Sequence, residues 1–171
     1  MTPEDFQKIF PFVRDWISQT LAGHASKAIS VASFNFPRLP RYYNNDLLAR
    51  AKVVLVDKCP VPPLSTIGLS QFAEFENMNA RGITYLDTYF VLRQEAERES
   101  LHFHELVHVV QWQLLGVESF LALYADGLEK HGYRNSPLEV IAYNHEARFN
   151  SNATSYSVEA SVRQQLQPFL N

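Results

Sequence analysis

Two histidines four residues apart, His104 and His108, constrain this chain more than any other feature, because Glu105 stands between them in an apolar run. On a helix, residues four apart lie on the same face, so the two imidazoles can bind one Zn²⁺ while the glutamate reaches the attacking water. This HExxH pattern on a helix is typical of zinc hydrolases. The sequence therefore predicts a helix that carries a zinc site, with Glu105 as the general base.

The residues around the pattern indicate that this helix is buried. Large apolar side chains surround it on almost every side: Leu101, Phe103, Leu106, Val107, Val109, Val110, Leu114 and Leu115. Two histidines and a glutamate destabilise such a helix unless they are paired, hydrogen-bonded or bound to a metal. The alternative interpretation is a pair of core histidines bonded to backbone carbonyls, with Glu105 in an ion pair. Gly116 is expected to end the helix.

A catalytic zinc site usually has three protein ligands and one open position. The short HExxHxxGxxH spacing is absent, because Gln111 and Leu114 stand where that pattern has glycine and histidine. The histidines outside the pattern are His24, His102, His131 and His145. A carboxylate is therefore the expected third ligand, with Glu139 as first choice and Glu146 as second. Both lie on the helix predicted to begin after Ser136.

Each of these glutamates has a second interpretation. Glu139 stands three residues after Ser136, with Pro137 at the first helical position, and this spacing also fits a capping box. Glu146 equally fits a solvated helix face, or a hydrogen-bond partner of a ligating histidine. The sequence alone leaves these alternatives open.

Residues 53–149 resemble the zincin metallopeptidases, and within them the gluzincin branch, in which a glutamate on a later helix follows HExxH. The resemblance is to a group of small bacterial proteins, and it rests on these segments: Pro62-Pro63-Leu64, Ile67-Gly68-Leu69, Gly82-Ile83-Thr84, Phe90-Val91, residues 103–112, Leu115-Gly116, Tyr124, Gly132-Tyr133, Pro137-Leu138-Glu139 and Ala142-Tyr143. It implies a Zn²⁺ held by His104, His108 and Glu139, with Glu105 as general base, and no defined substrate. Tyr143 departs from the thermolysin-like pattern, which has an aspartate at that place.

The expected fold is a single α+β, zincin-like domain over residues 1–171, with a small mixed sheet packed on the buried HExxH helix and a mainly helical C-terminal half. A strand is predicted at 52–57, and residues 82–92 also read as a strand. By the resemblance, the stretch 83–91 edges the cleft, where a peptide can add a strand of its own. An ordinary edge strand is the alternative. Helices are predicted at 2–23, with a kink or break at Pro11, and at 46–51, 70–77, 117–130, 137–149 and 158–166.

Composition limits the partners and the compartment. A formal net charge of −3 and the lack of a basic stripe argue against a nucleic-acid partner or an anionic membrane. No segment is expected to reach transmembrane length. Cys59 is the single cysteine, so no internal disulfide can form and a cytoplasmic location is the default. Cys59 is expected to be a small buried apolar residue, the alternative being a thiolate that caps the zinc.

The function predicted from these patterns is zinc-dependent hydrolysis of peptide bonds in a peptide or protein substrate. The tetrahedral oxyanion needs a donor besides the metal. Tyr143 is the first choice, because it follows Glu139 by one helical turn, and Tyr133, His145 and Arg148 are the alternatives. Two other classes stay open: a catalytically silent zinc-binding regulatory or interaction domain, and a structural helical domain with a metal-free polar network.

Overall fold

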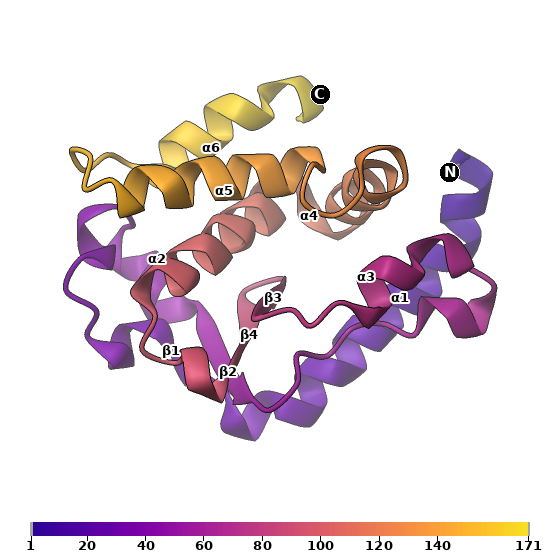
Figure 1. The fold of residues 1–171 in the computed structure, drawn as a ribbon, viewed down its shortest axis with the longest axis horizontal. Helices are drawn as coiled ribbons and strands as arrows, with labels where there is room; N and C mark the ends of the chain where they lie inside the picture. Colours follow the sequence, from indigo (N-terminus) through magenta and orange to yellow (C-terminus); the bar gives the residue numbers. More distant parts are fainter. Residues whose placement is uncertain (1, 171) are drawn as a thin grey trace.

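The computed structural model describes residues 2–170 and has an α+β architecture, as the sequence predicts (Figure 1). Its sheet contains β1 (Ile29–Ser30), β2 (Lys52–Val56), β3 (Gly82–Tyr85) and β4 (Thr88–Leu92) in the order β1-β2-β4-β3. β2 and β4 are parallel and the other pairs are antiparallel, so the sheet is mixed. The α-helices of the described part are α1 (Pro3–His24), α2 (Asn45–Arg50), α3 (Ala73–Asn77), α4 (Glu99–His131), α5 (Pro137–Asn150) and α6 (Val158–Leu166).

The sheet lies between α4 and α1. Successive side chains of a strand point to opposite faces. On one face, Thr84 of β3 contacts Glu105 of α4, and Tyr89 of β4 donates to or accepts from His102 at 2.8 Å. On the other face, the rings of Tyr85 and Phe90 pack against Trp16 and His24 of α1. The HExxH segment is therefore buried against the sheet, as predicted.

α4 is two helices joined at Gly116. The residue has φ 73° and ψ 174°, a backbone conformation that is open only to glycine, and the helix resumes beyond it. The predicted stop at Gly116 and the predicted second helix over 117–130 are both confirmed. The first half, up to Trp112, is buried at every position from Leu101 onward. This half carries the histidine pair into the core.

The remaining helices agree closely with the sequence, with one exception in α1. α6 has the predicted bounds, α5 ends one residue later than predicted, and Thr2 caps α1 by accepting from the Asp5 backbone N–H at 3.1 Å. Of the kink or break expected at Pro11, the break is wrong, because α1 continues through Pro11 to His24. Beyond the proline, the helix packs against the core through Val13, Trp16, Ile17 and Leu21, which stabilises it.

Residues 82–92 form a hairpin, so the prediction of one strand from Ile83 to Val91 is wrong. β3 and β4 pair antiparallel, with Tyr85 opposite Thr88 and a two-residue turn of Leu86 and Asp87 between them. Leu86 takes a positive φ of 59° at this turn. β3 is the edge strand of the sheet and β4 lies inside it.

By length and composition alone, α4 could cross a membrane, contrary to the expectation that no segment reaches that length. Half of its apolar window is buried inside the protein, and the core helix of a soluble protein has the same composition. Gly116 interrupts the helix within the same run. The length of α4 is therefore only weak evidence for a membrane span.

Candidate metal centre

Three side chains converge at the contact between α4 and α5. His104 and His108 come from α4 and Glu139 from the first turn of α5, and their exposed fractions are 4%, 5% and 2%. The two Nε2 atoms lie 3.2 Å apart, and Glu139 Oε2 lies 3.5 Å from His104 Nε2 and 3.4 Å from His108 Nε2. These three residues form a buried group that could hold a metal ion.

The spacing of the three atoms fits one small cation. Zn–N and Zn–O bonds of about 2.0–2.2 Å at tetrahedral angles place neighbouring ligand atoms about 3.3–3.6 Å apart. The three observed separations, 3.2, 3.4 and 3.5 Å, lie in or beside that range. Glu139 Oε2 is buried and has no hydrogen-bond partner among the described residues. A buried carboxylate oxygen without a donor is destabilising, and a cation between the three atoms removes that cost.

The Nδ1 atom of each imidazole already has a hydrogen-bond partner. His104 Nδ1 lies 3.2 Å from Glu146 Oε2, and His108 Nδ1 lies 2.8 Å from Gln111 Oε1. The amide nitrogen of Gln111 donates to the Leu138 carbonyl at 3.0 Å, which leaves the amide oxygen as acceptor for His108. With the proton on Nδ1, each Nε2 presents a lone pair to the common point, as in metal-ligating histidines.

The charges of the group balance only with a positive charge at its centre. Burial alone would raise the pKa of Glu139, but the charge of His108 and the contacts with both imidazoles hold it well below its ordinary value. Burial alone would lower the pKa of His104, but contacts with Glu139 and Glu146 raise it to about 10. The cluster thus favours a positive charge, which a proton or a metal ion could supply.

The two glutamates make different contacts in the structure. Ser136 occupies the N-cap position of α5, but its side chain makes no capping hydrogen bond, and the carboxylate of Glu139 points to the histidines instead. The capping box is therefore not formed. Glu146 contacts His104 through Nδ1 and does not belong to the group of three, so in this structure it is a hydrogen-bond partner of His104.

Glu105 lies beside the group without belonging to it. Its Oε2 accepts from Thr84 Oγ1 at 2.7 Å, and burial raises its pKa above the ordinary value, an effect that the nearby His104 and His108 oppose. Gly82 of β3 leaves room for this carboxylate, because a Cβ at residue 82 would lie 2.8 Å from Glu105 Cδ. The sheet thus fixes the position of Glu105 through Thr84 and Gly82.

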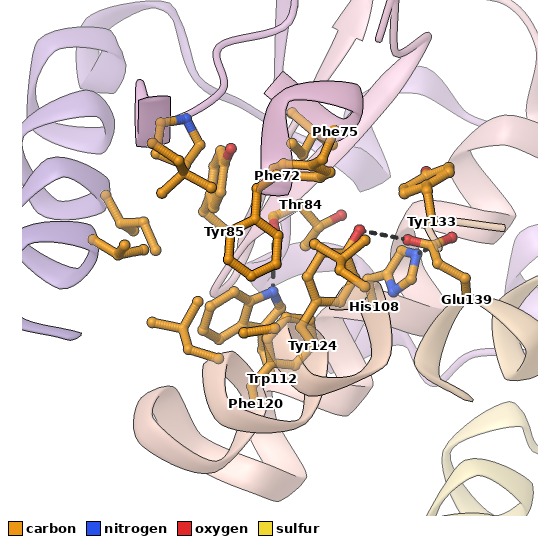
Figure 2. A pocket seen from close by; sticks show the side chains of 18 of the residues that line it. Phe72, Phe75, Thr84, Tyr85, His108, Trp112, Phe120, Tyr124, Tyr133 and Glu139 are labelled. Carbon is orange, nitrogen blue, oxygen red and sulfur yellow. Dashed lines mark hydrogen bonds and ion pairs between the residues drawn. The ribbon is translucent and has the colours of Figure 1, made fainter. Parts of the chain in front are cut away.

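Three polar residues of the site were missed by reasoning from the sequence. Tyr124 donates to Glu139 Oε1 at 2.8 Å (Figure 2). Thr84 donates to Glu105, and Gln111 accepts from His108. Gln111 had a usable signal, because it follows His108 by three residues on the same helix. Tyr124 and Thr84 lie 15 and 21 residues from their partners and carried no local signal.

The four candidate oxyanion donors fall into two groups. The Tyr143 ring packs on His104 with ring centroids 4.7 Å apart, and Tyr133 lies close to both Tyr143 and Glu139. His145 instead bonds Tyr156 and Gln165, and Arg148 stacks on the Tyr156 ring. His145 and Arg148 are therefore committed elsewhere, and the tyrosines are the candidates that the fold brings to the site.

Cys59 and His102 are buried, and their contacts indicate a structural role. Cys59 Sγ lies 3.7 Å from the Phe90 carbonyl, and burial raises the pKa of the thiol to about 12, so the thiol stays protonated. It is a small buried apolar residue, as predicted. His102 bonds Tyr89 through one nitrogen and the Ala96 carbonyl through the other, which leaves no lone pair for a metal.

Comparisons with protein-family models, with curated proteins and with solved structures find no match for this chain.

Proposed function

We propose that this protein is a zinc-dependent peptidase of zincin-like, gluzincin type, with His104, His108 and Glu139 as metal ligands and Glu105 as general base. The observation that carries the proposal is the trio of ligand atoms at 3.2, 3.4 and 3.5 Å, spaced as on the edges of one tetrahedron. Two histidines and one glutamate with a fourth open position are a ligand set of zinc hydrolases. The net charge and the single cysteine favour a cytoplasmic enzyme that acts without nucleic acid or membrane.

The bound ion would act as a Lewis acid and would lower the pKa of its water to about 7. The side chains of the protein supply the base and the hydrogen-bond donors that hydrolysis needs. Glu105 follows His104 directly in α4 and stands outside the ligand set, so its carboxylate is free to take the proton of the attacking water and to pass it to the leaving amine. Thr84 donates to one of its oxygens, which holds the carboxylate in position. Tyr143, against His104 and half-buried, is the proposed donor to the oxyanion.

Metal content tests the first half of the proposal. The protein purified without chelator is expected to contain close to one zinc per chain by mass spectrometry of the metals, and a His104→Ala, His108→Ala double variant to contain none. A wild-type protein that holds no zinc and takes up none from solution would contradict the proposed site.

The Glu105→Gln variant tests the second half. Glutamine keeps the size of the side chain and its bond to Thr84, but an amide cannot accept the proton of water, so zinc content and fold are expected to survive while hydrolysis of a peptide library falls by roughly 10²-fold or more. Thr66→Ser, at an exposed position of the 3-10 helix Leu64–Ile67, is the control. If wild-type hydrolysis persists undiminished in Glu105→Gln, Glu105 is not the base. If the zinc protein hydrolyses no peptide at all, the silent zinc-binding domain becomes the better description.

A further inference from the structure

The proposed metal centre faces a small cavity that is bounded by α1, by residues 62–75, by β3 and by both halves of α4. Its volume is about 90 Å³, less than the roughly 150 Å³ of a protein cavity that holds one benzene molecule. The side chains of the proposed chemistry, His104, Glu105, His108 and Glu139, are at most 5% exposed. A peptide residue with its backbone is larger than benzene. A substrate therefore reaches these side chains only if one wall of the cavity moves.

One wall belongs to the segment 61–80, which lies between β2 and β3 and includes α3. The sheet fixes both flanks of this segment. The Pro60 carbonyl accepts from the Tyr85 hydroxyl at 2.8 Å, and the Arg81 carbonyl accepts from the Leu92 backbone N–H at 3.0 Å. The segment thus has a fixed point at each end, about which it can pivot without disturbing the strands.

Between these two points, the segment is hydrogen-bonded to itself. Ser65 donates to both carboxylate oxygens of Glu76, through its backbone N–H at 2.8 Å and its hydroxyl at 2.9 Å, which ties the 3-10 helix Leu64–Ile67 to α3. In the described part of the chain, no hydrogen bond or ion pair joins residues 61–80 to residues outside the segment. A segment that is bonded only within itself can move as one unit.

Apolar side chains hold the segment against the rest of the protein. Leu64, Phe72 and Phe75 are buried, and the Phe75 ring meets the Tyr124 ring edge-on, with centroids 5.9 Å apart. Tyr124 is also the donor to Glu139. Figure 2 shows Phe72 and Phe75 across the pocket from Tyr124 of α4. The contacts that close the cavity therefore lie next to the proposed ligands.

The opposite wall, α1, is held at both ends by contacts with other elements. Near its start, Gln7 donates to Glu118 of α4 at 2.8 Å. In its second half, the rings of Trp16 and His24 pack on the sheet. Of the two walls, the segment 61–80 is thus the one that opens without breaking a hydrogen bond.

We propose that residues 61–80 form a lid, which moves away from α4 as one unit and admits substrate to the proposed metal centre. This inference rests on the proposed function and adds how its site is controlled. The cavity lies along β3, the edge strand of the sheet, so an open lid uncovers a strand edge with which a peptide can pair. The closed state excludes substrate, so the peptidase is latent until the lid opens.

Relaxation dispersion of methyl groups in the zinc-free protein tests whether the segment moves as a unit. The methyl groups of Leu64 and Leu69, in the lid, are expected to share one exchange process on the μs–ms timescale. Those of Ile9 and Val13, which line the same cavity from α1, are expected to take no part in it. If Ile9 and Val13 share the process, α1 is the moving wall and the lid is refuted.

A variant with a matched control tests which contacts keep the lid closed. Phe75→Ala removes the ring that packs on Tyr124 and is expected to raise the open population at least about tenfold. Phe10→Ala, on the α1 wall, enlarges the same cavity and is expected to change that population less than about twofold. Equal effects of both variants, or no shared process in either the wild type or Phe75→Ala, would refute the lid. If Phe75→Ala does not fold, the wild-type protein decides alone.

Access to the ion connects the lid with the site. Benzohydroxamate is a metal-binding probe whose phenyl ring does not fit the closed cavity. It is mixed with the zinc-loaded protein and followed by tryptophan fluorescence, since Trp112 lines the cavity. Its association rate constant is expected to rise in Phe75→Ala by the same factor as the open population, and an unchanged rate constant would overturn the proposal. If the protein holds no zinc, the proposed function fails by itself, and the methyl exchange decides separately whether residues 61–80 open.

Discussion

At the scale of single residues, each proposed ligand has two polar side-chain atoms with different partners. Each imidazole has one nitrogen for the proposed ion and one for a fixed acceptor, Glu146 for His104 and Gln111 for His108. Glu139 likewise divides its oxygens, since Oε1 accepts from Tyr124 and Oε2 faces the histidines. The ligands are therefore oriented by the protein before an ion arrives, which lowers the cost of binding.

Substitution of each of two glutamates on α5 tests which of them is the metal ligand. Glu139→Gln is expected to weaken zinc affinity at least tenfold more than Glu146→Gln, because it removes a ligand and not a hydrogen-bond partner of a ligand. Competition with a colorimetric zinc chelator measures both, and Glu74→Gln, on the exposed side of α3, is the control. Equal losses in both variants would contradict the assignment of Glu139.

A further residue prediction concerns Gly82. Gly82→Ala places a Cβ against the Glu105 carboxylate, which must then move away from Thr84. Zinc content is expected to stay near one per chain, while peptide hydrolysis falls by about tenfold or more, because a displaced base is costly. Hydrolysis at the wild-type rate would show that the position of Glu105 is not critical.

The site could be predicted from the sequence where its residues are linked by helical spacing. His104, Glu105 and His108 lie within two turns of one helix. Glu139 was chosen differently, as the carboxylate expected on a later helix once no third histidine had the right spacing. Spacing cannot report contacts between elements that are distant in the chain, which is why the bond from Thr84 to Glu105 was missed.

At the scale of elements, the sequence predicted the ends of helices correctly where the chemistry of a single residue sets the boundary. Gly116 ends a helix because its conformation excludes other residues, and Thr2 starts one through its hydroxyl. The turn at Leu86 was missed because a hairpin of this length usually has glycine or asparagine at its positive φ, and here leucine takes it. The pairing of β3 with β4 imposes that turn, and a local pattern cannot reveal it.

Alanine substitution at two glycines of helices is expected to change the free energy of unfolding in opposite directions. Gly116→Ala is expected to lower the free energy of unfolding by about 1–3 kcal/mol, because alanine does not tolerate its φ of 73° and ψ of 174°. Gly23→Ala, inside α1 with nothing within 4 Å of an added Cβ, is expected to raise it by about 0.5–1 kcal/mol. Urea titrations measure both. Stabilisation by Gly116→Ala would contradict the kink.

At the scale of the whole molecule, the proposed ion would join α4 to α5, and α5 has no place in the sheet. The sheet ends at Leu92, and the described residues after it, up to Leu170, form helices and their connections. α4 lies between the two parts, with β3 on one side and α5 on another. Stability of the helical half is therefore expected to depend on the contact between α4 and α5.

Chelation tests this dependence. Zinc held at about a thousand times its Kd stabilises the folded state by about 4 kcal/mol, and each kcal/mol shifts Tm by about 2–4 °C in a chain of this size. Removing zinc with a chelator is expected to lower Tm by about 10 °C, and Zn²⁺ but not Mg²⁺ is expected to restore it. A zinc-containing protein whose Tm is indifferent to chelation would show that the ion does not join the two helices.

The bond from Gln111 to the Leu138 carbonyl has a kinetic consequence. It ties α4 to the start of α5 next to Glu139, and all three proposed ligands are nearly inaccessible to solvent. Because its three proposed ligands come from two helices, an ion at this place is expected to leave when α4 and α5 separate locally, although its fourth position is open. Its dissociation is then expected to be unimolecular, with a rate that is independent of chelator concentration. That rate should equal the rate at which the first hydrogen-bonded amides of α5, from Val140 onward, open to hydrogen exchange. Gln111→Ala would speed both processes by the same factor.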